Sequence, residues 1–222
     1  MANRVMWPAL KRSIVAILRG VQPGEVEAIA EILIDEQIEA IEVPLNSPEP
    51  FQSIGRVCKS FGNDCLIGAG TVLHLEQCDR VAGIGGRLLV SPNINPAIVA
   101  RAEGHGMVTL PGVFTATEAL LAVHSGASAL KIFPAVTLGP SGVSALKTIL
   151  PEGTFVGVVG GISDRNLAEF AKVGVQIFGL GTSLYKQGDD KAVIRTRAKA
   201  AVRAYDAAIA SNRGAARRAS II

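Results

Sequence analysis

The chain has 222 residues, of which 49% are hydrophobic and only 5% are aromatic, and its formal net charge is +3. This length fits one α/β barrel or one to two smaller domains, with a core built mainly from aliphatic side chains. No apolar run is long enough to cross a bilayer, and residues 1–8 lack the apolar stretch of a signal peptide. We therefore expect a soluble cytoplasmic protein.

Apolar runs and segments with helical spacing alternate along the chain. Strands are predicted at residues 14–19, 40–45, 65–72, 87–91, 107–113, 129–134, 155–160 and 176–181, and helices at 25–36, 50–61, 75–84, 96–104, 117–124, 141–150, 164–173 and 190–210. The strands are near-continuous apolar runs rather than alternating ones, which is typical of a parallel sheet covered on both sides.

Eight strands, each followed by a helix, predict a single (β/α)8 TIM barrel over residues 13–210. Residues 1–12 are expected to form a short helix that caps the bottom of the barrel. A doubly wound open sheet is the main alternative. That fold usually marks its first strand-to-helix turn with G-x-G-x-x-G, and residues 19–24 lack this pattern.

The end of the chain is basic, with Arg213, Arg217 and Arg218 and no acid among them. A nucleic-acid arm is one interpretation, but we favour a disordered tail over residues 211–222, because chain ends commonly fray. We expect neither a nucleic-acid nor a membrane partner.

Residues that could bind a metal are sparse. The three cysteines form no C-x-x-C pair, which also argues against a disulfide framework. His74, His105 and His124 are far apart and fall in predicted helices or loops. We expect no metal and no cofactor.

Lys131 lies in the apolar run 129–135, which is predicted to be a buried strand, whereas the other lysines lie in charged stretches or turns. A buried ammonium is costly unless it is paired or deprotonated. A lysine that loses its proton near neutral pH becomes a nucleophile toward carbonyl groups. Lys131 therefore predicts an amine-catalysed enzyme.

Glu42 is the only carboxylate inside a predicted strand, and it lies on the second strand while Lys131 lies on the sixth. Barrel interiors are layered, with each layer built from alternate strands, so the two side chains can share a layer. A buried structural ion pair is the alternative, but replacing such pairs with apolar residues is often neutral or stabilising. We favour a catalytic pair, because perturbed buried groups cluster at functional sites.

Two glycine clusters end neighbouring strands, Gly160–Gly161 on the seventh and Gly181–Thr182 on the eighth. Barrels often bind phosphate with the loops after these two strands, through backbone N–H groups. Simple tight turns would also use glycine, but the two clusters together favour a phosphate site.

The stretches that end successive strands match one enzyme family. They are 17–20 (ILRG), 42–48 (EVPLNSP), 68–72 (GAGTV), 92–94 (PNI), 130–134 (LKIFP), 159–161 (VGG) and 180–182 (LGT). In these stretches the sequence resembles the class I 2-keto-3-deoxy-6-phosphogluconate (KDPG) and 4-hydroxy-2-oxoglutarate (KHG) aldolase family, and the resemblance covers residues from about 12 to 206.

This resemblance implies a carbon–carbon lyase that acts, as a homotrimer, on a phosphorylated keto-deoxy sugar acid and releases pyruvate and D-glyceraldehyde 3-phosphate. Lys131 would form a Schiff base with the substrate, and Glu42 would move protons. The resemblance assigns substrate binding to Arg19, Thr71 and Pro92 at the carboxylate, Phe133 at the pyruvyl part, and Gly160, Gly161, Gly181 and Thr182 at the phosphate.

Pro44, Asn46 and Val159 depart from the gluconate branch of the family, which typically has Thr, Arg and Thr at these positions. Val159 is instead similar to the galactonate branch, and a valine cannot hydrogen-bond a substrate hydroxyl. We therefore expect 2-dehydro-3-deoxy-6-phosphogalactonate as the substrate and count Val159 among the binding residues. Thr182 replaces the serine usual in the family.

Three alternatives remain at this point. The enzyme could prefer the gluconate epimer, accept both epimers, or act on 4-hydroxy-2-oxoglutarate. It could be another phosphate-binding barrel, an isomerase or synthase of the kind found in thiamine or tryptophan synthesis. A sugar-phosphate binding protein without catalysis is the third, but binding alone does not require a nucleophilic lysine beside a carboxylate.

Overall fold

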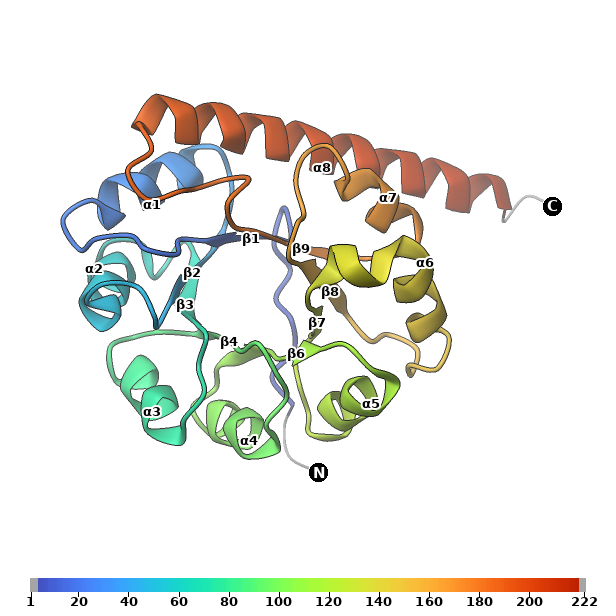
Figure 1. Ribbon diagram of the computed structural model, residues 1–222, viewed down its shortest axis with the longest axis horizontal. Coiled ribbons are helices and arrows are strands. Elements are labelled where there is room, and N and C mark those ends of the chain that lie inside the picture. Colours follow the sequence, from blue (N-terminus) through green and yellow to red (C-terminus); the bar gives the residue numbers. More distant parts are fainter. Residues whose placement is uncertain (1–3, 220–222) are drawn as a thin grey trace.

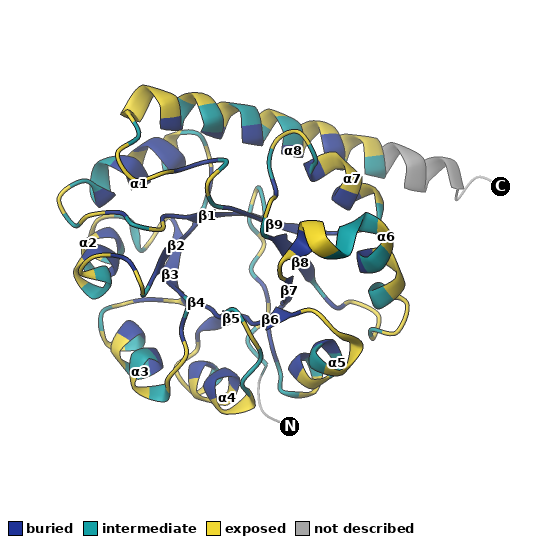
Figure 2. Cartoon of the chain, in the orientation of Figure 1, coloured by how far each residue is buried: buried dark blue, intermediate teal, exposed yellow. Residues whose placement is uncertain are grey.

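The chain folds into a nearly closed ring of parallel strands surrounded by helices (Figure 1). The computed structural model describes residues 4–219, with side chains described as far as Asn212. The strands are almost entirely buried, and the helices expose their outer faces (Figure 2).

The strands of the ring follow the order β5-β4-β3-β2-β1-β9-β8-β7-β6. They are β1 (Ile14–Ile17), β2 (Ala40–Pro44), β3 (Leu66–Gly70), β4 (Leu88–Val90), β5 (Val108–Leu110), β6 (Gly112–Val113), β7 (Leu130–Ile132), β8 (Val156–Val159) and β9 (Ile177–Leu180). The helices are α1 (Val26–Asp35), α2 (Pro50–Phe61), α3 (Leu75–Gly83), α4 (Pro96–Gly104), α5 (Ala116–His124), α6 (Ala135–Lys147), α7 (Leu167–Lys172) and α8 (Lys191–Ala219).

The predicted fifth strand, 107–113, is divided at Pro111 into β5 and β6. Proline has no backbone N–H to contribute to a ladder, and β5 pairs with β4 while β6 pairs with β7. Pro111 still accepts a hydrogen bond, 2.9 Å long, from the backbone N–H of Lys131. The two short strands together form one side of the ring, so the predicted (β/α)8 architecture is confirmed.

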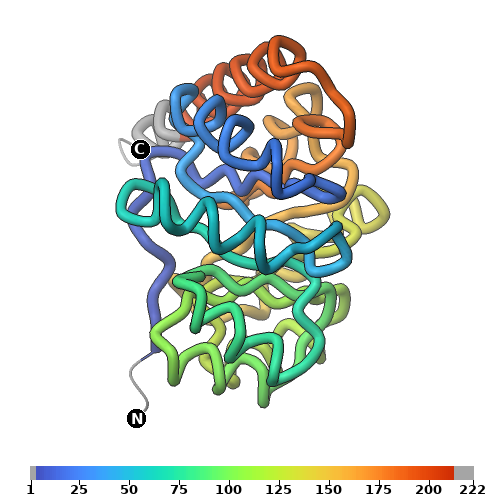
Figure 3. The backbone as a smooth tube through the Cα atoms, turned by 90° about the vertical axis from the view of Figure 1, so that its left-hand side faces the viewer, coloured from blue at the N-terminus to red at the C-terminus, as the bar shows by residue number. Residues whose placement is uncertain are grey.

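The segment before β1 differs from the prediction, because none of its described residues, 4–12, is helical. It instead runs in an extended path across one end of the barrel (Figure 3). Its Trp7 side chain is buried, and the indole Nε1 lies 3.3 Å from Ser13 Oγ. The segment therefore caps the barrel bottom, as expected, but with a tryptophan rather than with a helix.

Two helices are longer than predicted, α6 at its start and α8 at its end. Helix α6 begins at Ala135 rather than at 141 and contains a break at Gly139, whose φ of 69° is left-handed and which precedes Pro140. Helix α8 continues past 210 to Ala219, over residues that the prediction places in a disordered tail. The last part of that predicted tail, 220–222, lies outside the described residues.

Two layers of apolar side chains form the core. The larger fills the space between strands and helices, and within it the rings of Phe178 and Tyr205 meet edge to face at 5.9 Å. The smaller lies inside the ring at its lower end, where Val15, Ala40 and Leu66 pack around Trp7. This smaller layer therefore forms an apolar floor beneath the side chains that occupy the upper interior of the barrel.

Trp7→Ala should lower the free energy of unfolding by about 3–5 kcal/mol, because it removes a buried indole and leaves a cavity in this floor. Urea denaturation followed by circular dichroism would measure the change. Met6→Ala is the matched control, since that neighbouring side chain is 58% exposed, and it should change stability by no more than about 0.5 kcal/mol. Equal effects of the two substitutions would contradict the capping role of Trp7.

Candidate active site

Lys131 and Glu42 occupy the upper interior of the barrel and are almost fully buried, with exposed fractions of 6% and 4%. Lys131 is in register with Gly112 on β6 and Gly157 on β8. Glu42 is in register with Gly68 on β3. Glycine therefore stands beside each charged residue on a neighbouring strand, and at Gly68 and Gly112 a Cβ would overlap the backbone of Leu88 or Pro92, so the backbone packs closely around the pair.

Burial moves the pKa values of both groups toward neutrality. The pKa of Glu42 is raised to about 7, because desolvation disfavours the carboxylate more than the positive charges of Lys131 and Arg19 favour it. The pKa of Lys131 is lowered to about 8 by desolvation, which the negative charge of Glu42 opposes and the positive charge of Arg19 reinforces. An amine and a carboxyl that both titrate near pH 7 can serve as nucleophile and as general acid–base.

Glu42 is not fixed by polar contacts. Its Oε2 atom is buried and has no hydrogen-bond partner among the residues that the structure describes. The Nζ atom of Lys131 lies 5.0 Å from the centre of the Phe133 ring, which places a cation or amine over an aromatic face.

Arg19 joins the loops that follow β1, β2 and β3. One guanidinium nitrogen donates a hydrogen bond to Asn46 Oδ1, and another lies 3.5 Å from Thr71 Oγ1. Thr71 has a φ of 57°, a left-handed conformation that is rare for a β-branched residue. Ser47 Oγ accepts a hydrogen bond of 3.0 Å from the backbone N–H of Gly20, so this side chain also joins the loops after β1 and β2.

A cavity of about 420 Å³ opens beside this arginine, over the ends of β1, β7, β8 and β9. Seven of the predicted site residues line it, namely Arg19, Phe133, Val159, Gly160, Gly161, Gly181 and Thr182. Its wall also contains Ile17, Ile162 and Gly179, which the sequence did not single out. The cavity has one cation, a largely apolar middle and a glycine-rich far side.

Four predicted site residues are not part of this cavity wall, namely Lys131, Glu42, Thr71 and Pro92. Lys131 adjoins the wall through Phe133, and Glu42 interacts with Lys131 by charge. Thr71 reaches the site through its contact with Arg19. Pro92 is half-buried after β4, and its carbonyl oxygen lies so close to Gly112 that a Cβ there would overlap it. Pro92 therefore packs beside the strand next to Lys131, and the structure does not bring it to the cavity.

The glycine-rich side requires glycine at two positions. Gly160 and Gly161 have φ values of 92° and 78°, in the left-handed region. A Cβ on Gly161 would also come within 2.6 Å of Val136 Cγ1. This backbone can approach a ligand closely without interference from side chains.

Two polar residues that sequence reasoning missed hold this side in place. Asn166 donates from Nδ2 to the carbonyl of Gly161 at 2.9 Å and accepts from the N–H of Ser163 at the same distance. Ser183 donates to the carbonyl of Ile162 at 2.8 Å, which joins the loops after β8 and β9. Asn166 directly precedes α7, but its side chain makes no capping bond to that helix, so a capping pattern would not have revealed this role.

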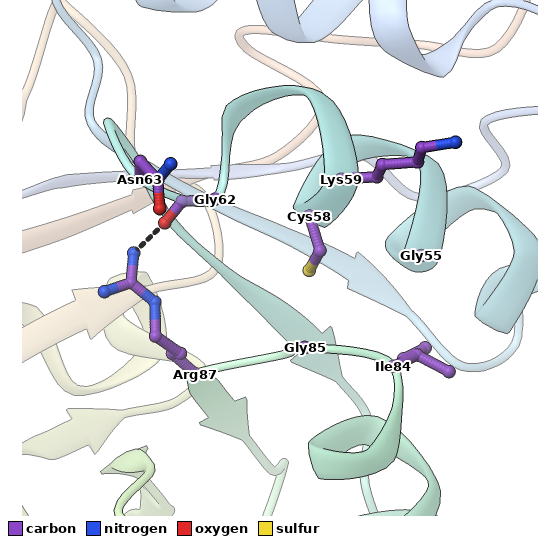
Figure 4. Close-up of a pocket in the computed structure, with 8 residues that line it drawn as sticks. All are labelled: Gly55, Cys58, Lys59, Gly62, Asn63, Ile84, Gly85 and Arg87. Atoms are coloured by element: carbon purple, nitrogen blue, oxygen red, sulfur yellow. Dashed lines mark hydrogen bonds between the residues drawn. The ribbon is translucent and has the colours of Figure 1, made fainter.

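A second hollow, of about 410 Å³, lies near the starts of β3 and β4 (Figure 4). Arg87 is already committed there, because its guanidinium donates to the carbonyls of Gly62 and Cys65. Burial raises the pKa of Cys58 to about 11, so its thiol stays protonated at neutral pH. Arg87 and Cys58 therefore offer neither a free cation nor a nucleophile, and Lys59, which also lines the hollow, is the remaining charged side chain of its wall.

The residues that the structure describes contain no group of three or more His, Cys, Asp or Glu side chains placed to hold a metal ion. His105 is paired instead with Asp79, at 2.7 Å. In the same part of the chain, no helix combines the length and apolar character needed to cross a membrane.

Comparisons with known proteins agree with the resemblance seen in the sequence. A family model described as KDPG and KHG aldolase matches residues 9–198. The chain is 51% identical over 205 residues to the probable 2-dehydro-3-deoxy-6-phosphogalactonate aldolase of Rhizobium meliloti (strain 1021), covering 92% of this chain and 97% of the relative. It is 44% identical over 199 residues to the 2-dehydro-3-deoxy-6-phosphogalactonate aldolase of Escherichia coli (strain K12), covering 90% and 97%.

A solved structure described as native KDPGal has a similar fold. The two structures superpose with a TM-score of 0.90 at 44% sequence identity, covering 92% of this chain and 98% of the other.

The charge of Arg19 should depress the pKa of both buried groups. In Arg19→Gln we expect the midpoints of Glu42 and Lys131 both to move upward, because the lost positive charge had favoured the carboxylate and disfavoured the ammonium. Carbon-13 NMR titration of the two side chains would measure this. Arg203→Gln, on the exposed outer face of α8, is the charge-matched control and should leave both midpoints unchanged. Movement of the two midpoints in opposite directions would contradict the inferred effect of the Arg19 charge on the two groups.

Proposed function

The chain belongs to the KDPG and KHG aldolase family, and we propose that it cleaves 2-dehydro-3-deoxy-6-phosphogalactonate to pyruvate and D-glyceraldehyde 3-phosphate. The observation that carries the proposal is Lys131, a buried amine whose pKa is lowered to about 8, which interacts by charge with Glu42 and lies beside a cavity at the carboxyl ends of the strands. Active sites of (β/α)8 barrels form at that end of the strands.

The first chemical step uses Lys131 as the nucleophile. Its neutral amine attacks the C2 ketone of the substrate, and the resulting carbinolamine loses water to give an imine. The imine is a stronger electron acceptor than the ketone once it is protonated. The lowered pKa matters here, because a larger fraction of the amine is unprotonated at neutral pH than would be the case for a solvated lysine.

Glu42 supplies the proton transfers. As a carboxylate it removes the proton of the C4 hydroxyl, through a water molecule. The C3–C4 bond then breaks, its electron pair enters the imine to form an enamine, and the C4 fragment leaves as D-glyceraldehyde 3-phosphate. Glu42 next returns the proton to C3 of the enamine. Water adds to the imine that this regenerates, and pyruvate and free Lys131 are released.

The geometry of the cavity supports an orientation for the substrate. Its single cation, Arg19, would pair with the carboxylate of the keto acid, assisted by Thr71. Phe133, which lies beside Lys131, would pack on the pyruvyl part. The phosphate would be bound by the backbone of Gly160, Gly161 and Gly181 and by Thr182. At the other end of the substrate, Pro92, which packs against Gly112 of β6, would support the carboxylate side.

Val159 supports the galactonate epimer as substrate. It ends β8 immediately before the glycine pair, where its side chain lines the cavity. Its methyl groups cannot accept or donate a hydrogen bond, so a C4 hydroxyl directed at this wall gains nothing. The relatives with 51% and 44% identity carry the galactonate name, which supports the same choice.

The cellular setting that we propose is a cytoplasmic homotrimer that acts in galactonate degradation. These three features are supported by family membership. The pathway proposal also rests on the galactonate name of the two relatives. We further propose that residues 211–222 lie outside the catalytic unit, since the family model ends at residue 198.

Pyruvate and borohydride together should attach a pyruvate-derived mass to Lys131, because borohydride reduces the imine to a stable amine. Mass spectrometry of proteolytic peptides would locate the label. Lys172, a lysine on an outer helix, provides the internal control and should stay unmodified. An unmodified Lys131 would exclude the imine mechanism and would favour another kind of phosphate-binding barrel.

The two epimers of the phosphorylated substrate should be cleaved at different rates. We expect kcat/KM to favour the galactonate epimer by at least about tenfold, because Val159 offers the other epimer no hydrogen bond. Coupled assay of glyceraldehyde 3-phosphate release from each epimer would measure the ratio. Val159→Thr, which replaces one methyl with a hydroxyl, should narrow it. A preference for the gluconate epimer in the unchanged enzyme would overturn the substrate assignment.

A further inference from the structure

Gly70 ends β3 beside the catalytic carboxylate. It is in register with Pro44 on β2, two residues beyond the pairing of Gly68 with Glu42. In a sheet, residues two apart on one strand face the same side, and diagonal neighbours on adjacent strands lie within reach of each other. The Glu42 side chain thus leans along its strand toward Gly70.

A side chain at position 70 would collide first with Glu42. A Cβ there would overlap Oε2 and Cδ of Glu42 and come within 2.5 Å of Oε1, and these are its three nearest atoms. Gly70 is not among the glycines with positive φ, so its backbone is open to alanine. What requires glycine here is the carboxylate and not the chain conformation.

We propose that Gly70 is a positioning residue. Because it has no side chain, it leaves a space, called the seat below, in which the Glu42 carboxylate is held in place for proton transfer. This inference rests on the proposed function, because it assigns Gly70 a role only if Glu42 moves protons. The seat is a contact surface rather than a hydrogen bond, which agrees with the lack of a partner for Oε2 among the described residues.

The consequence of filling the seat would be catalytic rather than structural. Glu42 can rotate about its side-chain bonds, so the carboxylate can move aside and absorb an added methyl at little cost to folding. A base displaced by about 1 Å loses roughly 100-fold in rate. The carboxylate would also leave its desolvated position against β3. The pKa of Glu42 would then fall from its raised value toward that of a solvated carboxyl.

Other glycines in the barrel provide contrasts. A Cβ on Gly68 would overlap the backbone carbonyl of Leu88, which cannot rotate aside, so that glycine serves the fold. A Cβ on Gly83, at the end of α3, would meet nothing within 4 Å. Gly70 differs from both, because its neighbour is the movable end of a catalytic side chain.

The test is Gly70→Ala with pyruvate as the probe. Exchange of the pyruvate methyl protons with solvent deuterium, followed by NMR, reports proton transfer by Glu42, whereas borohydride trapping reports imine formation by Lys131. We expect exchange to fall by about 100-fold, with trapping and the thermal midpoint close to those of the unchanged enzyme. The rising limb of the exchange rate against pH should move to lower pH. Gly83→Ala is the matched control and should leave all four measurements unaltered.

A second substitution separates positioning from a general defect. Glu42→Asp shortens the side chain by one methylene, which makes room for the alanine methyl. We expect Glu42→Asp to reduce exchange in the unchanged enzyme, and to reduce it much less, or to restore it, in the Gly70→Ala background. An equal cost in the two backgrounds would overturn the proposal.

Three further outcomes are decisive. Exchange within about threefold of the unchanged enzyme in Gly70→Ala would show that no seat is needed. Failure of Gly70→Ala to fold, or loss of trapping together with exchange, would assign Gly70 a purely structural role and would also overturn the proposal. Absence of trapping in the unchanged enzyme would instead contradict the proposed function, so the two failures are distinguishable.

Discussion

The structure depends on the burial of two opposite charges, Lys131 and Glu42, inside an aliphatic barrel. Burial leaves each group little access to water, so each depends on the charge of the other for its own charged form, while Arg19 favours the carboxylate of Glu42 and disfavours the ammonium of Lys131. Desolvation is the larger influence on both, which is why their pKa values approach each other from opposite sides. A purely structural pair would gain most from a direct, fully hydrogen-bonded contact, yet Glu42 keeps a buried oxygen without a partner among the described residues. Both groups can therefore change protonation near neutral pH, although their burial lowers the stability of the folded protein.

Glycines around this pair determine its geometry. Gly112 and Gly157 flank Lys131, and Gly68 flanks Glu42, at matched positions of the ladder. On the far side of the cavity, Gly160 and Gly161 adopt left-handed conformations that bring backbone close to a ligand. The cavity thus has a cation at one end and an uncharged backbone at the other. Such a division suits a substrate whose carboxylate must be oriented and whose phosphate must be bound and then released.

Sequence reasoning succeeded where the signal is local. Continuous apolar runs separated by helical segments predicted the barrel, and the lysine and glutamate stood out because they interrupt two of those runs. It was less accurate where backbone chemistry intervenes, as at Pro111, which divides one strand in two. It also failed at Trp7, because a single large side chain can cap a barrel without any periodic pattern. Pro92 follows a strand as predicted and packs against Gly112 rather than lining the cavity, and its role in substrate binding stays a prediction.

The sequence by itself determined the fold class and the reactive groups, because periodicity and the presence of a charge in an apolar run are properties of short segments. Only the tertiary structure decided which groups meet. Arg19, Asn46 and Thr71 are brought together from the ends of three strands, and Asn166 and Ser183 join loops that no local pattern connects. Above all, the contact between Gly70 and Glu42 depends on the register of β2 against β3. Register is fixed by pairing between distant segments, so it cannot be read from either segment alone.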